Sequence, residues 1–148
     1  MRKLIFAIST PVLALALGIT ASFADPVEDR EALMKANGAA MGALSAYVKG
    51  EKDYDAADVL AQLTKLNEDA VKLKSPDLWP AGSDANSEAS PKIWEDAAGF
   101  QAALDKFEAD TAAAVAAAPA DVDALKAQVG AIGANCASCH QGFRVRKG

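Results

Sequence analysis

Three segments of this chain place apolar residues three and four positions apart without a break, and this spacing is the strongest constraint on its fold. They extend from Ala56 to Leu73, from Ile93 to Ala114 and from Val122 to Phe143. Such spacing puts side chains on one stripe of an α-helix, whereas a strand needs alternation with a period of two. Alanine, the strongest helix former, is abundant throughout. The pattern predicts an all-α fold and excludes a sheet.

A fourth helix is expected from Pro26 to Lys49. Met34 and Met41 lie seven residues apart on the face of this helix that is expected to meet the core. The one long irregular stretch, residues 75–90, contains prolines and a glycine and must cross from one helix pair to the other. The other connections are short. Together these features predict a single domain built as an antiparallel four-helix bundle.

Local chemistry predicts where the helices begin and end. Gly50 follows the first helix, and Asp53 or Asp55 can cap the second by accepting a hydrogen bond from its free backbone amides. Pro91 suits the start of a continuous third helix, because proline there loses no needed donor. Asp121 lies just before the expected fourth helix.

Residues 1–24 are expected to be an export signal that is removed from the mature protein. Two basic residues are followed by a mostly apolar stretch and by small residues before Asp25, which is the pattern of a signal peptide. An uncleaved membrane anchor is the alternative, because residues 4–24 are just long enough to span a bilayer. An internal proline and glycine disfavour the anchor. We therefore expect a periplasmic domain of residues 25–148 with no stable membrane anchor.

The charge of the expected domain excludes one class of partner. Of the 15 Lys and Arg, only Arg2 and Lys3 precede residue 25, and all 20 Asp and Glu lie within residues 25–148, so the domain has 13 basic side chains and a net charge of −7. Nucleic acid binding requires the opposite sign. The single histidine and both cysteines lie within five residues of one another, which excludes a dispersed catalytic triad. No enzyme activity is predicted.

The stretch from Cys136 to His140 reads Cys-Ala-Ser-Cys-His and holds the chain's two cysteines and its only histidine. On a helix, positions i, i+3 and i+4 bring three side chains to neighbouring places on one face. Two thiols at this spacing can add to the two vinyl groups of a haem, and the adjacent imidazole can then bind the iron. The motif predicts one haem c attached through Cys136 and Cys139, with His140 as the proximal ligand.

Three other interpretations of this motif are weaker. A thioredoxin-like dithiol belongs at a helix start that follows a strand, whereas this motif ends the last helix. A zinc site needs four tetrahedral ligands, and no second ligand pair is present. A disulfide between Cys136 and Cys139 would close a strained, very small loop.

The opposite face of the iron has no histidine available. Its ligand is therefore Met34 or Met41, or no protein ligand at all. A thioether is a soft donor that favours ferrous iron. The ordinary role of a methionine at such a helix position is to fill the core, so spacing alone does not choose between these possibilities.

The chain resembles the class II c-type cytochromes, the cytochrome c prime family. The resemblance rests on the terminal Cys-x-x-Cys-His-x-x-Phe-Arg, together with residues 78–82 and 91–94. It implies that Arg30 lies one turn before the distal residue, which is Met34, as in the low-spin branch where that methionine binds iron. It leaves Met41 as a packing residue. It also implies that Arg30 and Arg144 neutralise haem propionates or border the proximal pocket, although a solvated residue and a helix-end charge remain alternatives for them.

The function implied by the resemblance is single-electron transfer, with redox proteins of a respiratory or photosynthetic chain as partners. The alternative is a five-coordinate protein that binds nitric oxide or another small gas, in which Met34 lies near the iron without a bond. A peroxidase is disfavoured because no second histidine is present. Homodimerisation stays open, since some relatives pack as dimers through their first two helices.

Overall fold

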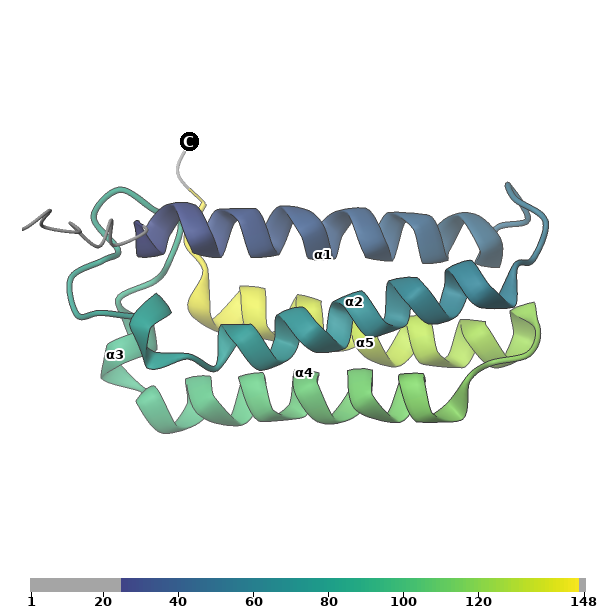
Figure 1. Cartoon of the computed structure of the whole chain (residues 1–148). Coiled ribbons are helices and arrows are strands. Elements are labelled where there is room, and N and C mark those ends of the chain that lie inside the picture. The colour runs from purple at the N-terminus through teal and green to yellow at the C-terminus, as the bar shows by residue number, and fades with distance from the viewer. Residues whose placement is uncertain (1–24, 147–148) are drawn as a thin grey trace, which may run out of the picture.

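The computed structural model describes residues 25–146 and consists of four long helices (Figure 1). These are α1 (Pro26–Val48), α2 (Ala56–Leu73), α4 (Ala97–Ala117) and α5 (Val122–Phe143). The crossover connection, residues 74–96, contains a 3₁₀ turn, η1 (Pro76–Leu78), and a one-turn helix, α3 (Lys92–Glu95). No strand occurs anywhere in residues 25–146. The predicted all-α four-helix bundle is confirmed.

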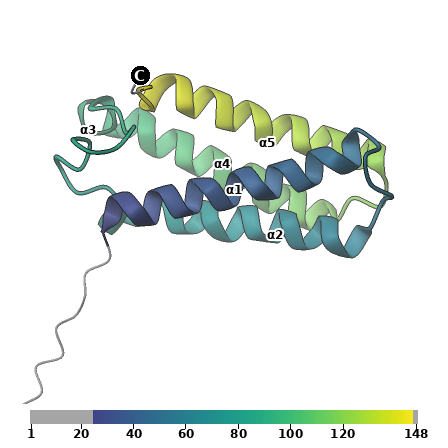
Figure 2. The same cartoon turned by 90° about the horizontal axis from the view of Figure 1, so that it is seen from above.

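Each long helix packs against its neighbours in the chain, and α5 closes the bundle by packing against α1. Successive long helices run in opposite directions, as Figures 1 and 2 show. The start of α1, the crossover connection and the end of α5 consequently gather at the same end of the bundle. This end brings together segments from both termini of the described chain.

The core consists of two apolar clusters. The larger one occupies the half of the bundle away from the crossover connection and is centred on fully buried aliphatic side chains, among them Leu44, Leu63, Leu66, Leu125 and Ile132. The smaller one lies at the crossover end and contains Leu73, Ile93, Phe100 and Leu104. Trp79 and Phe143 pack against this second cluster, with Phe100 in edge-to-face contact with both rings. The second cluster thus forms an aromatic floor at the crossover end.

Aspartates cap the helices, as their short acceptor side chains allow. The carboxylates of Asp25, Asp55 and Asp121 accept hydrogen bonds from backbone amides in the first turns of α1, α2 and α5. Asp55, rather than Asp53, is therefore the cap of α2. Gly50 ends α1 with a φ of 71°, and its amide donates to the Tyr47 carbonyl at 3.0 Å. The predicted ends of these helices are close to those observed.

The prediction of a continuous helix from Pro91 is wrong, because the helix is interrupted at Asp96. Asp96 has φ −124° and ψ 59°, and its carboxylate accepts from the Gly99 amide at 3.1 Å. This side chain competes with the carbonyl of the preceding turn for the free amide, so it ends α3 and starts α4. A Cβ on residue 99 would collide with the carboxylate, which explains the glycine there.

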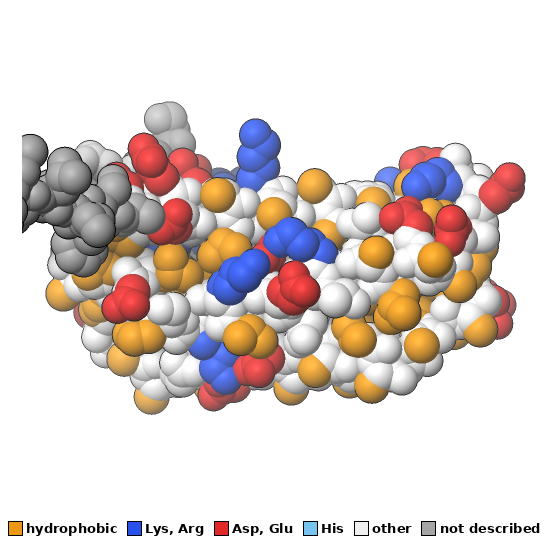
Figure 3. All heavy atoms as spheres, viewed as in Figure 1, with side chains coloured by type: hydrophobic (Ala, Val, Ile, Leu, Met, Phe, Trp, Pro, Cys, Tyr) orange, Lys and Arg blue, Asp and Glu red, His pale blue; other side chains and the backbone are white. Residues whose placement is uncertain are grey.

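The face drawn in Figure 3 shows Lys and Arg side chains next to Asp and Glu, with no continuous basic surface. This arrangement agrees with the acidic net charge and does not favour nucleic acid binding on that face. In residues 25–146, no helix is both long enough and apolar enough to cross a membrane.

Ala118→Gly is expected to raise the free energy of unfolding by about 1 kcal/mol. Ala118 follows α4 with φ 40° and ψ 63°, a left-handed conformation that costs alanine about 1–2 kcal/mol, whereas glycine adopts it freely. Urea unfolding measures the change. Ala113→Gly, at an exposed interior position of α4, is the matched control and should lower the free energy of unfolding by about 1 kcal/mol. A loss of stability in Ala118→Gly would contradict the prediction.

Candidate functional site

A cavity of about 530 Å³ opens at the crossover end of the bundle. Such a volume falls within the range of about 300–1,000 Å³ that is common for ligand and cofactor pockets. The walls come from α1, the crossover connection, α4 and α5. Most of them are apolar, including Val27, Trp79, Ala89, Ile93, Phe100 and Leu104. The cavity therefore suits a large and mostly apolar group.

The last two turns of α5 bring Cys139 and His140 to the cavity wall. Cys136 lies one turn earlier, is partly buried and packs against the larger core cluster. Both thiols are free. The expected juxtaposition on one helix is present, with the difference that Cys136 lies behind the cavity wall and does not line it.

Burial favours the neutral forms of the titrating groups in this turn. Burial raises the pKa of both the Cys136 and the Cys139 thiols. Burial lowers the pKa of His140, the neighbouring Arg144 lowers it further, and Glu88 opposes the shift. A neutral imidazole offers the free electron pair that a metal ligand requires.

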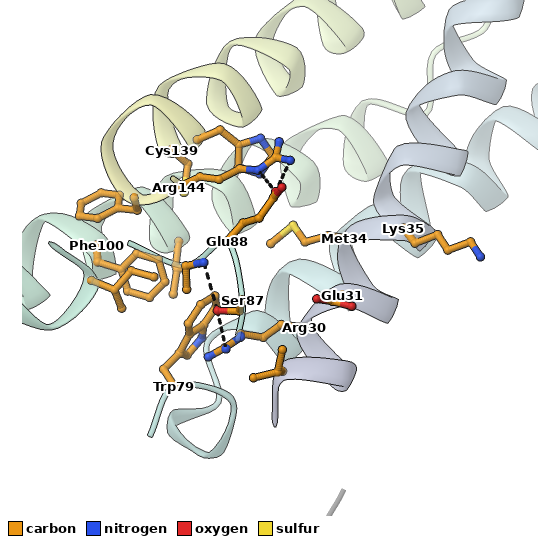
Figure 4. A pocket seen from close by; sticks show the side chains of 16 residues that line it. Arg30, Glu31, Met34, Lys35, Trp79, Ser87, Glu88, Phe100, Cys139 and Arg144 are labelled. Carbon is orange, nitrogen blue, oxygen red and sulfur yellow. Dashed lines mark hydrogen bonds and ion pairs between the residues drawn. The ribbon is translucent and has the colours of Figure 1, made fainter. Parts of the chain in front are cut away.

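Met34 reaches the same cavity from α1. It is 36% exposed, so it is not the core residue that its helix spacing suggested. Figure 4 shows its side chain extending from α1 towards Glu88 and the turn that carries Cys139. Met41, by contrast, packs against the larger core cluster. The structure therefore separates the two methionines into a cavity residue and a packing residue.

Arg30 lines the cavity but is only 4% exposed. Its two terminal nitrogens donate to the Leu78 carbonyl at 2.9 Å, to the Ser83 hydroxyl and carbonyl at 2.7 and 2.6 Å, and to the Ser87 hydroxyl at 3.3 Å. Its guanidinium also lies 4.9 Å from the ring centroid of Trp79. Four of its five N–H groups are thus engaged by the crossover connection, and only Nε–H is left for another acceptor. Arg30 is not a solvated helix residue.

Arg144 follows α5 directly and faces the crossover connection. Its Nε donates to the Glu88 carboxylate at 2.5 Å, and Nη2 pairs with the same oxygen. Both side chains line the cavity (Figure 4). Sequence reasoning identified Arg144 but not Glu88, Ser83 or Ser87, because residues of an irregular connection carry no periodic signal.

Comparison with known proteins shows the family of this chain. The family model described as Cytochrome C′ matches residues 25–144. The chain belongs to the cytochrome c′ family. Cytochrome c-556 of Agrobacterium tumefaciens (strain II Chrys) is 41% identical over 124 residues, which cover 84% of this chain and 100% of that protein. Cytochrome c′ of Rhodopseudomonas palustris is 38% identical over 149 residues, covering 98% and 99%.

Solved structures of cytochromes c′ share the fold. The structure of the Rhodopseudomonas palustris protein superposes with a TM-score of 0.76 at 38% identity, over 84% of this chain and 99% of that one. Relatives named c-556 and relatives named c′ have similar identities to this chain. The residues of the cavity must therefore decide between the properties of the two.

The residues of the site fit the haem c of a c-type cytochrome. The end of α5 supplies two thiols and an imidazole whose pKa is lowered by burial, and α1 supplies a thioether to the same cavity. The floor is aromatic, with Trp79, Phe100 and Phe143 in edge-to-face contact. This combination of soft sulfur, nitrogen and apolar walls matches what an iron porphyrin requires.

Proposed function

We propose that this protein is a periplasmic carrier of single electrons with one haem c, which Cys136 and Cys139 would attach and whose iron His140 and Met34 would bind. The observation that carries the proposal is the cavity that Cys139 and His140 face from α5 and Met34 faces from α1. The protein is an electron carrier and not an enzyme, as befits the cytochrome c′ family.

Each residue of the site has a separate task. The two thiols anchor the group by thioether bonds, which prevents its loss from a small domain. His140 would supply an imidazole nitrogen from α5, and Met34 would supply a thioether sulfur from α1. When bound, haem supplies iron that alternates between the ferric and ferrous states. Because the two ligands belong to helices packed against each other, they need move little when the charge changes.

The cavity walls favour a high reduction potential. A thioether ligand stabilises ferrous iron relative to ferric iron. Apolar walls act in the same direction, because they solvate the extra positive charge of the ferric state poorly. The guanidinium of Arg30, which is buried without a carboxylate partner among its hydrogen bonds, adds a fixed positive charge on the cavity wall.

The cellular setting follows from the sequence. We propose export by residues 1–24, which lie outside the described residues, and the family match that begins at residue 25 supports a cleavage there. The acidic domain suits redox partners of a respiratory or photosynthetic chain that present basic surfaces. Size-exclusion chromatography of the purified protein tests homodimerisation.

A gas-binding protein is the second candidate. A mutant cytochrome c′ from Alcaligenes xylosoxidans, solved as a nitric oxide complex, superposes with a TM-score of 0.74 at 31% identity, over 85% of this chain and 98% of that one. The partial exposure of Met34 also favours it, because an exposed ligand can leave the iron at small cost. The two candidates differ in whether the Met34 thioether holds the sixth position.

The spectrum and redox titration of the protein, matured in a host that attaches haem c, test the proposal. We expect one haem per chain that stays with the protein in acid acetone, a one-electron titration, and the narrow bands of low-spin iron in both oxidation states. A colourless product would overturn the proposal. High-spin iron that takes up carbon monoxide readily would instead establish the gas-binding alternative.

A further inference from the structure

The crossover connection is tied to the chain just beyond α5. The Ser90 amide donates to the Phe143 carbonyl at 3.0 Å, and the Val145 amide donates to the Glu88 carbonyl at 2.8 Å. Ala89 and Arg144 form the one β-bridge found in residues 25–146. We call this contact between residues 88–90 and 143–145 the terminal pairing. It fixes the position of the helix turn that carries His140.

The terminal pairing also brings two opposite charges to the cavity. The Glu88 carboxylate accepts from Arg144 Nε at 2.5 Å, and the two side chains are 44% and 43% exposed. Arg144 is the first residue after α5 and has an extended backbone, with φ −122° and ψ 138°. Glu88, Arg144 and His140 all line the same cavity, so a positive and a negative charge both lie beside the imidazole.

We propose that Glu88 is a positioning residue for the proximal side of the site: it compensates the charge of Arg144 beside His140 and thereby lowers the reduction potential. The inference rests on the proposed function. A positive charge near the iron favours the ferrous state, and a negative charge favours the ferric state. With both present the pair is nearly neutral, so loss of either partner leaves the other uncompensated.

A double-mutant cycle tests this inference. At a fixed applied potential, Glu88→Gln should raise the ratio of ferrous to ferric protein about threefold, or about 30 mV at 59 mV per tenfold. Arg144→Gln should lower the ratio by a similar factor. The double variant should return close to the wild-type ratio, because neither charge remains. Glu51→Gln is the matched control, since it removes an exposed, ion-paired carboxylate beyond the far end of α1 and should leave the ratio unchanged.

Two further measurements separate charge compensation from a merely structural role. The shifts of both single variants should shrink between about 0.01 M and about 1 M salt, because the pair is half-exposed and is screened. Hydrogen exchange at the Val145 amide and the urea midpoint of the whole bundle should both stay near their wild-type values in Glu88→Gln, because the Glu88 backbone carbonyl that accepts from Val145 is retained.

Shifts of the same sign in both single variants, or shifts no larger than that of Glu51→Gln, would overturn the inference. If the variants give either result while the wild-type protein still titrates as a one-electron centre, the proposed function stays intact. A wild-type protein that lacks a redox-active haem would instead overturn the proposed function.

Discussion

Met34→Ala is expected to convert a low-spin, ligand-resistant protein into a high-spin one that binds carbon monoxide about 10- to 1,000-fold more tightly. While the thioether occupies the iron, an external ligand must compete with it, so its apparent affinity falls by the fraction of protein in which the methionine is released. A minor state of this kind is typically about 0.1–10% populated. Alanine has no sulfur to bind the iron, so every molecule of the variant is able to bind carbon monoxide.

The comparison variant is Met41→Leu. Met41 packs against the larger core cluster, and leucine preserves its volume and apolar character, so this variant should keep the low-spin spectrum. Absorption spectra of both oxidation states and a carbon monoxide titration of the reduced proteins measure the two changes. A Met34→Ala protein with an unaltered spectrum would show that the distal ligand is assigned wrongly.

Arg30→Met is expected to lower the free energy of unfolding by about 3–5 kcal/mol. The variant keeps much of the apolar stem but removes the hydrogen bonds to Leu78, Ser83 and Ser87. Acceptors left unsatisfied in a buried place cost about 1–3 kcal/mol each, and hydrogen bonds to charged groups contribute about 1.5–3 kcal/mol. The crossover connection, which Arg30 holds to α1, would then loosen.

Urea unfolding of the variants measures this effect. Two further substitutions serve as controls for the loss of charge and for the loss of the hydrogen bonds. Lys35→Met removes an exposed positive charge from the same helix and should change stability by less than about 0.5 kcal/mol. Arg30→Lys keeps the charge but cannot reproduce the paired donors of a guanidinium, so it should recover only part of the loss. If Arg30→Met costs no more than Lys35→Met, Arg30 does not anchor the connection.

Most of the fold could be predicted from the sequence because each helix carries its own signals. An acidic cap such as Asp55 and a terminal glycine such as Gly50 act within a few residues, and the apolar stripe between them repeats every turn. The break at Asp96 was missed because Ile93 and Phe100 continue the apolar pattern on both sides of it. The Asp96 and Gly99 pair was the available local signal.

Some residues of the candidate site could likewise be predicted from the sequence, and others could not. Cys139 and His140 could be placed because their spacing on one helix fixes their relation. The exposure of Met34 could not be deduced from the sequence, because it depends on the distance between α1 and the two segments opposite it, α5 and the crossover connection. Glu88 and Ser83 belong to an irregular segment whose path is set by contacts with Arg144 and Arg30, which are distant in sequence.

The gathering of both chain termini at one end of the bundle has a consequence for biogenesis. Met34 is synthesised among the first residues of the domain and His140 among the last, so a ribosome must finish nearly the whole chain before the two can meet. Under the proposed function, a prematurely terminated product would lack the attachment motif altogether and stay without pigment. The colour of the purified protein would therefore report only on molecules that have been translated almost to their final residue.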